Sequence, residues 1–284
     1  MELRELIEKL NEGKVTRDRK AQPIKPAKAA EVWYRKQLLA VVAQLKEAAI
    51  SAFSDNKFTD EITPEEQIIL NRKLSSATDK MRAINIDQLA MQISRSFVSR
   101  GFRINEKRAS EEYQSIFGVD VARLAAGDTI RQQVEVSLVE NVNLIKSIQN
   151  DFINDIGKHV RDRLYAGERS TGMIQLIHER GDVTVNRAKF IARDQTAKLN
   201  ADLNQARNAD LGIDLYIWGG TGDARERDSH SVMNGMLCKY SDPTVYSDDM
   251  GKTWKKRKSI GGVELHPGKD YQCRCVSRPY IKWD

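Results

Sequence analysis

The chain has 284 residues, of which 40% are hydrophobic and 30% charged, and its formal net charge is +6. This length can bury one large core or two smaller ones, and the mild positive charge permits contact with nucleic acid without requiring it. No apolar run approaches the roughly 18 residues of a membrane helix, and the charged N-terminus is unlike a secretory signal. The cysteines are Cys238, Cys273 and Cys275; an odd number near one end argues against a disulfide framework and favours a reducing, cytosolic compartment.

The first 27 residues form a basic segment. Residues 14–28 carry a cluster of lysines and arginines with a single acid, Asp18, and they include Pro23 and Pro26. This composition predicts an extended N-terminal segment over residues 1–27. A solvated linker and an arm that binds phosphate groups or a partner protein are both consistent with it.

Residues 28–134 have the pattern of a helical domain. Apolar residues recur at spacings of three and four between Tyr34 and Ala52, which predicts a helix over residues 28–53. Residues 63–66 read Thr-Pro-Glu-Glu, a capping box with proline at the first helical position, which predicts a helix start there. We expect this helix to reach residue 100 and to end at Gly101, and another to follow over residues 106–117.

Residues 135–212 form a long-helix region that leads into the C-terminal part. With Asp128 as its cap, a helix is predicted over residues 129–165, and its apolar stripe is typical of a core or of a surface that faces a partner helix. At 1.5 Å per residue this helix would be ~55 Å long, which indicates an elongated helical body. Helices over 171–180 and 185–210 are expected to end at Gly181 and Gly212.

In residues 213–284 the helical periodicity of the preceding sequence is lost. Apolar and polar residues alternate from Ile213 to Trp218, which predicts a half-buried strand. Asp223 and Glu226 have capping-box spacing, which predicts a short helix over residues 224–234. The predicted fold is mainly α with a small α+β C-terminal module: an elongated helical body followed by a compact domain that contains cysteine and histidine.

The soft metal ligands of the chain gather in this module. They are His230, Cys238, His266, Cys273 and Cys275. A structural zinc site takes four such ligands in a tetrahedron, and both side chains of a Cys-x-Cys on a strand point to the same face. We therefore predict a zinc site formed by His230, His266, Cys273 and Cys275. The alternative is that the thiols are small buried hydrophobic groups.

The same histidines allow an enzymatic interpretation. A divalent ion bound by His230 and His266 could activate water for phosphodiester cleavage, as in a metal-dependent nuclease. The module offers few carboxylates at ligand spacing, and no complete catalytic constellation is found. We expect that the protein is not an enzyme and keep the nuclease as the alternative.

A strongly basic run lies near the C-terminus. Residues 252–258 read Lys-Thr-Trp-Lys-Lys-Arg-Lys between Gly251 and Gly261, which predicts a hairpin tip or mobile loop. Cations bind DNA phosphates, and an aromatic ring among them can stack on a base. The DNA-binding residues predicted on this ground are Lys252, Trp254, Lys255, Lys256, Arg257 and Lys258. A solvated charged loop is the alternative.

Several motifs of the C-terminal part occur in a specific order. Trp218 of the predicted strand is followed by Asp-x-Arg-x-Arg-x-x-His over 223–230, by His-Pro-Gly over 266–268 and by Cys-Arg-Cys over 273–275. With the upstream helix over 187–200, this combination resembles the phage Mu F-like head morphogenesis domain, over about residues 135–284. The structural residues of the family motif are then Trp218, Asp223, Arg225, Arg227, Pro267 and Arg274. Cys238 departs from the pattern, so we leave it outside the zinc set.

The resemblance implies a minor head protein of a tailed bacteriophage that acts in head morphogenesis. Such a protein would bind the portal protein at the portal vertex, with scaffold or major capsid protein as further partners, and would contact double-stranded DNA. It would be present in the host cytoplasm during assembly, without membrane contact, and in the head of the virion afterwards.

Overall fold

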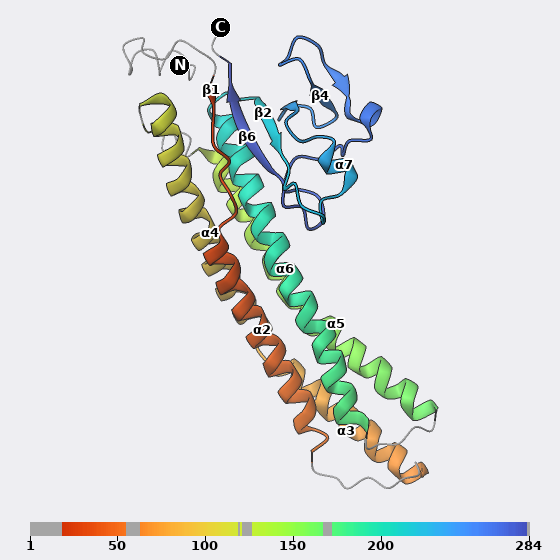
Figure 1. Ribbon diagram of the computed structural model, residues 1–284. Coiled ribbons are helices and arrows are strands. Elements are labelled where there is room, and N and C mark those ends of the chain that lie inside the picture. The colour runs from red at the N-terminus through yellow and green to blue at the C-terminus, as the bar shows by residue number, and fades with distance from the viewer. Residues whose placement is uncertain (1–18, 55–62, 119, 121–126, 167–171, 283–284) are drawn as a thin grey trace. The chain divides into compact units, whose positions relative to one another are not determined.

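A computed structural model describes residues 19–54, 63–118, 120, 127–166 and 172–282 (Figure 1). The helices are α2 (Lys28–Ser51), α3 (Pro64–Arg82), α4 (Ile86–Phe117), α5 (Asp128–Tyr165), α6 (Met173–Asp210) and α7 (Asp228–Ser231). The strands are β1 (Arg19–Lys20), β2 (Leu215–Gly219), β3 (Leu237–Lys239), β4 (Val245–Ser247), β5 (Lys255–Lys256) and β6 (Val276–Ile281), with a 3-10 helix η3 (Arg257–Ile260) after β5. This confirms a mainly α chain with a small α+β module at its C-terminal end. None of the described helices combines the length and the apolar character needed to cross a membrane.

The chain divides into two compact units, each assembled from separated stretches. The first contains the described residues up to Ala30, Val98–Ser137 and the chain from Asp194 onward, and the second contains Glu31–Phe97 and Leu138–Arg193. Each unit therefore draws on more than one of the segments 28–134 and 135–212 that were outlined from the sequence.

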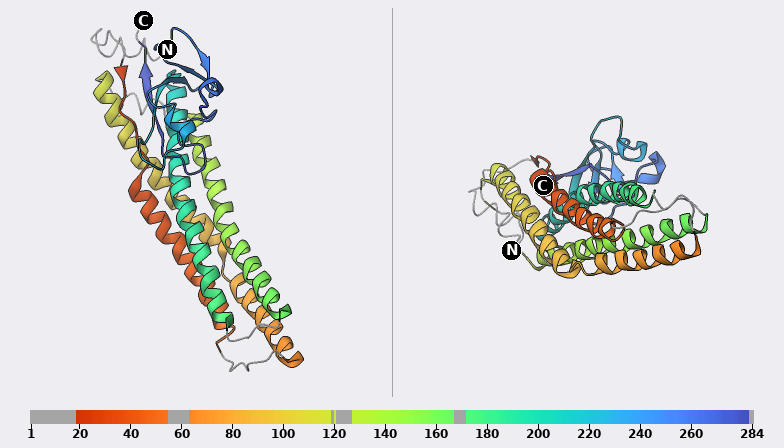
Figure 2. Two further views of the ribbon diagram at one scale, coloured as in Figure 1. Left: turned by 45° about the vertical axis from the view of Figure 1, so that its right-hand side comes forward. Right: turned by 90° about the horizontal axis from the view of Figure 1, so that it is seen from below.

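The second unit is a helical bundle whose helices run side by side (Figure 2). At its core the hydroxyl of Tyr34 donates to Asn141 Oδ1 at 2.8 Å, and the Tyr34 ring stacks on Phe97 with centroids 4.1 Å apart. Gln149 Nε2 of α5 donates to the carbonyl oxygen of Met81 at 2.7 Å. This bond satisfies one of the carbonyls that the end of α3 leaves without a helical partner.

The predicted starts of α2, α3 and α5 are confirmed, but two predicted ends are wrong, and the helices expected to start at residues 106 and 185 are continuations of α4 and α6. The capping box of α3 is present in both directions between Thr63 and Glu66. However, α3 ends at Arg82, and α4 runs through Gly101, where an added Cβ would lie 2.5 Å from Leu199 Cδ2. In α6, an added Cβ at Gly181 would lie 3.0 Å from Lys46 Cδ. Both glycines lie inside helices, where they allow another side chain to approach the backbone closely.

The first unit contains the sheet, whose strand order is β1-β6-β2-β3-β4-β5 with antiparallel pairing throughout. Strand β1 lies beside β6 (Figure 1), with Arg19 opposite Ile281 and Lys20 opposite Tyr280. After β1, Ala21 is buried and its amide donates to the carbonyl of Pro279 at 3.0 Å. Residues 19–27 are therefore part of the folded unit and not a solvated linker. Residues 1–18 of the predicted basic segment lie outside the described residues.

A buried polar network fixes this N-terminal segment to α4 and α6. Asn105 Nδ2 donates to Asn200 Oδ1 at 3.1 Å and to Asn204 Oδ1 at 2.7 Å. The side-chain nitrogens Nδ2 of Asn200 and Asn204 both donate to the carbonyl oxygen of Ile24, at 2.8 and 3.2 Å. Because buried polar groups are costly without partners, this network favours a single placement of the chain before α2.

Candidate metal centre

The motif segments meet next to strand β2. The predicted strand is confirmed as β2, and its Trp218 is buried. The ring of His230 lies edge-on to the Trp218 ring, with centroids 5.9 Å apart and planes at 90°. The Cys273–Cys275 segment is extended and leads directly into β6, which pairs with β2. The pairing of β2 with β6 thus brings His230 next to Cys273 and Cys275, which are 43 and 45 residues away in sequence.

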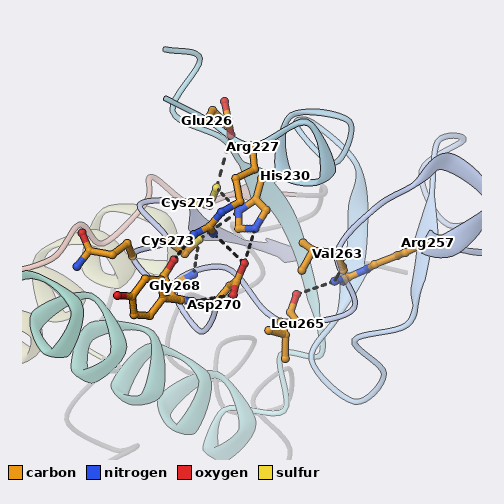
Figure 3. Close-up of polar contacts among 12 residues, drawn as sticks. Glu226, Arg227, His230, Arg257, Val263, Leu265, Gly268, Asp270, Cys273 and Cys275 are labelled. Carbon is orange, nitrogen blue, oxygen red and sulfur yellow. Dashed lines mark hydrogen bonds and ion pairs between the residues drawn. The ribbon is translucent and has the colours of Figure 1, made fainter. Parts of the chain in front are cut away.

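Three predicted ligands form one cluster. His230 Nδ1 lies 3.4 Å from Cys273 Sγ and 3.5 Å from Cys275 Sγ (Figure 3). One ligand atom from each of the three residues lies within 4.8 Å of the others, and all three residues are buried. Both cysteine side chains face the same side, as the extended Cys-x-Cys pattern predicts. A cluster of this composition could hold a metal ion.

The second nitrogen of His230 has a carboxylate partner. His230 Nε2 lies 2.9 Å from Asp270 Oδ2, and Arg227 Nη1 donates to the same oxygen at 2.8 Å (Figure 3). Arg227 Nη2 also donates to the carbonyl of Tyr271 at 2.6 Å. A carboxylate on one imidazole nitrogen fixes the tautomer and leaves the other nitrogen as the basic one. Here the nitrogen left for a ligand is Nδ1, which faces the two sulfurs.

The pKa values of the two thiols are shifted in opposite directions. The side-chain contact between the two sulfurs lowers the pKa of Cys273 and raises the pKa of Cys275. The hydrogen bond with Cys273 also raises the pKa of His230. Without a metal, the pair therefore retains a proton that a bound cation would displace, since metals bind thiolates.

The loop that carries Cys273 is folded against α6. Gly268 has φ +84 and Gln272 has φ 54, so the chain turns sharply at both ends of this loop. The amide of Gly268 donates to Cys273 Sγ at 3.3 Å, and the amide of Gln272 donates to Asp194 Oδ1 at 2.8 Å. A Cβ at Gly268 would lie 2.9 Å from the Cβ of Ala201, so only glycine allows this approach to α6.

The structure corrects the prediction that His266 is a fourth ligand. His266 Nδ1 lies 3.1 Å from the hydroxyl of Tyr216, and His266 is outside the cluster of His230, Cys273 and Cys275. Burial, and then the positive charge of Arg257, lower the pKa of His266 to about 4. The nuclease alternative required His230 and His266 on one ion, and the structure does not bring them together.

The prediction that Arg257 binds DNA is also wrong, because its side chain is fully buried. Its guanidinium donates to the carbonyl oxygens of Val245 at 3.0 Å, Val263 at 3.2 Å and Leu265 at 2.9 Å, and to the Tyr216 hydroxyl at 2.9 Å. Figure 3 shows it beside Val263 and Leu265. Arg257 therefore anchors the chain after β5 and cannot reach a phosphate.

Residues 252–254 lie in the connection of the antiparallel β4–β5 pair, as the hairpin prediction has it, and residues 255–258 belong to β5 and η3. Lys255 Nζ lies 2.8 Å from Asp248 Oδ2, and Lys258 Nζ lies 3.1 Å from Glu264 Oε2. Trp254 is partly buried beneath Lys239, whose Nζ lies 4.3 Å from the ring centroid. The exposed lysines at 252, 255, 256 and 258 remain candidates for phosphate contact.

Two of the other motif residues form an ion pair with each other. Arg274 forms a two-point ion pair with Asp223, and its Nη2 donates to Asp223 Oδ1 at 2.6 Å. Pro267 is buried and Arg225 is exposed.

The helix predicted over 224–234 is much shorter than expected. Only α7 forms there, because Asp223 and Glu226 do not cap a helix: Glu226 accepts from the amides of Thr221 at 3.1 Å and Gly222 at 2.7 Å.

Cys238 is buried in the module core but is not part of the cluster.

Sequence reasoning missed Asp270 and Asp194. Asp270 follows the His-Pro-Gly motif by two positions, and a lone carboxylate there carries no spacing signal that links it to His230. Asp194 is buried within the upstream stretch of the resemblance, yet only the fold shows that it accepts the amide of Gln272.

Comparison with known proteins agrees with the motif assignment. Residues 154–278 match the family model described as Phage Mu protein F like protein. The resemblance is thereby confirmed for these residues, which are similar to the phage Mu F-like family. A protein from Haemophilus influenzae, described as an uncharacterized protein, is 32% identical over 269 residues, which covers 93% of this chain and 56% of that protein. The chain thus spans about half the length of this curated relative. No solved structure matches the sequence at a significant level.

Proposed function

We propose that this protein is a minor head protein of a tailed bacteriophage that acts in head assembly and binds the portal vertex. The observation that supports this most is the match of residues 154–278 to the phage Mu F-like family. The three cysteines and His230 are buried in the module core, which favours a structural role. In this proposal the protein is made in the host cytoplasm and becomes part of the virion head.

Co-expression with the portal protein of the same phage tests the proposal. The complex should co-purify through affinity and size-exclusion steps, and procapsids assembled without this chain should be defective. Scaffold and major capsid protein, expressed separately with this chain, serve as competing partners. A chain that binds none of the three, and whose deletion leaves infectious heads unchanged, would contradict a role in head assembly.

We also propose a weak contact between the basic surface of β5 and DNA. Lys252, Lys256 and Lys258 are exposed and near the partly buried Trp254. Each neutralised phosphate adds to the slope of log affinity against log salt, by about 0.9 for double-stranded DNA. Charge removal at Lys252, Lys256 and Lys258 should flatten this slope by two to three phosphate equivalents. An unchanged slope would move the contact elsewhere on the chain.

We propose that the cluster of His230, Cys273 and Cys275 binds structural zinc. Tetrahedral zinc with Zn–S of about 2.3 Å and Zn–N of about 2.0 Å separates nitrogen from sulfur by about 3.5 Å. The nitrogen-to-sulfur distances in the cluster are 3.4 and 3.5 Å. The bond from His230 Nε2 to Asp270 is the outer contact that zinc-bound histidines commonly make.

Elemental analysis of freshly purified protein should find about one zinc per chain. Cys273→Ser should lose the metal and lower the melting temperature, because zinc binding contributes to folding. Cys238→Ser is the matched control, since Cys238 is also buried but lies outside the cluster, and it should keep the metal. Metal-free wild-type protein, or equal metal content in both variants, would contradict the zinc proposal.

A further inference from the structure

The cluster supplies three ligands, and a closed structural zinc site takes four. The predicted fourth ligand, His266, is held by Tyr216 and lies outside the cluster. A carboxylate is nearer. Cys275 Sγ donates to Glu226 Oε1 at 3.5 Å, and Figure 3 shows the Glu226 side chain directed toward this sulfur. Glu226 is outside the group of ligand atoms that lie within 4.8 Å of one another, so it is a neighbour of the metal-free cluster and not a member of it. Oxygen from glutamate is an established zinc ligand at about 2.0–2.2 Å.

The turn before α7 holds this carboxylate in place. Thr221 and Gly222 donate their amides to Oε1 at 3.1 Å and to Oε2 at 2.7 Å, respectively. Carboxylate oxygens each accept more than one contact, so Oε1 can keep its amide bond and also bind a cation. The backbone therefore holds the carboxylate beside Cys275 before any metal is present, and Oε1 has to move toward His230 Nδ1 and Cys273 Sγ to share an ion with them.

Gly220 makes room for this arrangement. A Cβ at Gly220 would lie 2.4 Å from Glu226 Oε1, which is closer than non-bonded atoms approach. The amide of Gly220 also donates to Asn234 Oδ1 at 2.9 Å, so this glycine has a defined position beside the turn. Any side chain at position 220 would push the carboxylate away from Cys275.

We propose that Glu226 is the fourth zinc ligand, binding through Oε1, so that one nitrogen, two sulfurs and one oxygen surround the metal. This inference rests on the proposed zinc site at His230, Cys273 and Cys275. Binding would draw Oε1 closer to the other ligand atoms than in the metal-free cluster. The ion would then connect three chain segments: the turn that follows β2, helix α7 and the Cys-Arg-Cys segment before β6.

Cobalt(II) substitution tests the proposal, because its ligand-field bands report the donor set and its sulfur charge-transfer bands report the thiolates. Glu226→Gln keeps the size of the side chain and an oxygen acceptor for the Thr221 amide but removes the negative charge. We expect this variant to keep the charge-transfer bands, to shift the ligand-field bands, and to bind zinc on the order of 10- to 100-fold more weakly in a chelator competition. Gly220→Ala, which leaves Glu226 unchanged, should produce the same shift and a similar loss of affinity.

Asp228→Asn is the control, because Asp228 is an exposed carboxylate in the same segment. This variant should bind both metals as the wild-type protein does. Wild-type spectra and zinc affinity in Glu226→Gln would overturn the assignment of the fourth ligand while leaving the zinc site in place. Absence of metal binding by the wild-type protein would overturn both proposals.

Discussion

Replacement of Arg257 by methionine should strongly destabilise the first unit. The guanidinium donates to three backbone carbonyls and the Tyr216 hydroxyl within the module. Hydrogen bonds to charged groups contribute ~1.5–3 kcal/mol each, and each buried acceptor left without a donor costs ~1–3 kcal/mol. Simple addition over four acceptors would approach the whole stability of a domain, ~5–15 kcal/mol. Because such contributions are not additive within a network, we expect a loss of about 3–5 kcal/mol.

Urea unfolding followed by tryptophan fluorescence measures this loss, since Trp218 is buried within 5.5 Å of the Arg257 guanidinium. Lys258→Met is the matched control: it removes a neighbouring positive charge whose side chain is 80% exposed, and it should change stability by less than about 0.5 kcal/mol. If Arg257→Met unfolds within about 1 kcal/mol of the wild-type protein, the anchoring role of the guanidinium is refuted.

Two further predictions concern helix packing and acid sensitivity. Gly101→Ala should destabilise the protein by about 1–3 kcal/mol through overpacking against Leu199, and in a Leu199→Ala background the same change should be neutral or stabilising, because alanine is the better helix former. A thermal double-mutant cycle with no coupling between the two sites would refute this. Since the pKa of His266 is lowered to about 4 in the folded protein from ~6.5 when unfolded, its neutral form contributes stability that is complete above pH 6.5 and is lost as pH falls toward 4. Between pH 7 and pH 5 this loss should be about 1–2 kcal/mol; urea midpoints of His266→Gln should fall less steeply over this range, and parallel pH profiles would contradict the assignment.

The sequence predicts a helix boundary well in this protein where the signal is a local contact. Thr63 marks the start of α3 because its capping box is made within the first turn. Gly101 and Gly181 were expected to end helices, yet the reason for each glycine is a close approach by Leu199 or Lys46 from a distant part of the chain. A local pattern cannot distinguish these two uses of glycine.

In the candidate site, too, features that depend on neighbouring residues were predicted, and features that depend on residues distant in sequence were not. The same-face arrangement of Cys273 and Cys275 follows from extended backbone alone, and the family motif includes His230. Exclusion of His266 depends on Tyr216, which contacts its Nδ1, and the burial of Arg257 depends on carbonyls of β4 and of the segment after η3. A run of basic residues indicates that most of its side chains are exposed, but in this run Arg257 is buried and donates hydrogen bonds inside the module.

The sheet is completed by its last strand in sequence. Strand β6 pairs on one side with β2 and on the other with β1, although about 260 residues separate β1 from β6. A ribosome must therefore translate the chain through β6 (Val276–Ile281) before either strand gains this neighbour. Until then β1 and β2 present open edges that can pair with other chains, so translation that stops before Val276 should yield products prone to aggregate. The long interval between making the first strand and pairing it also predicts slow folding of this unit.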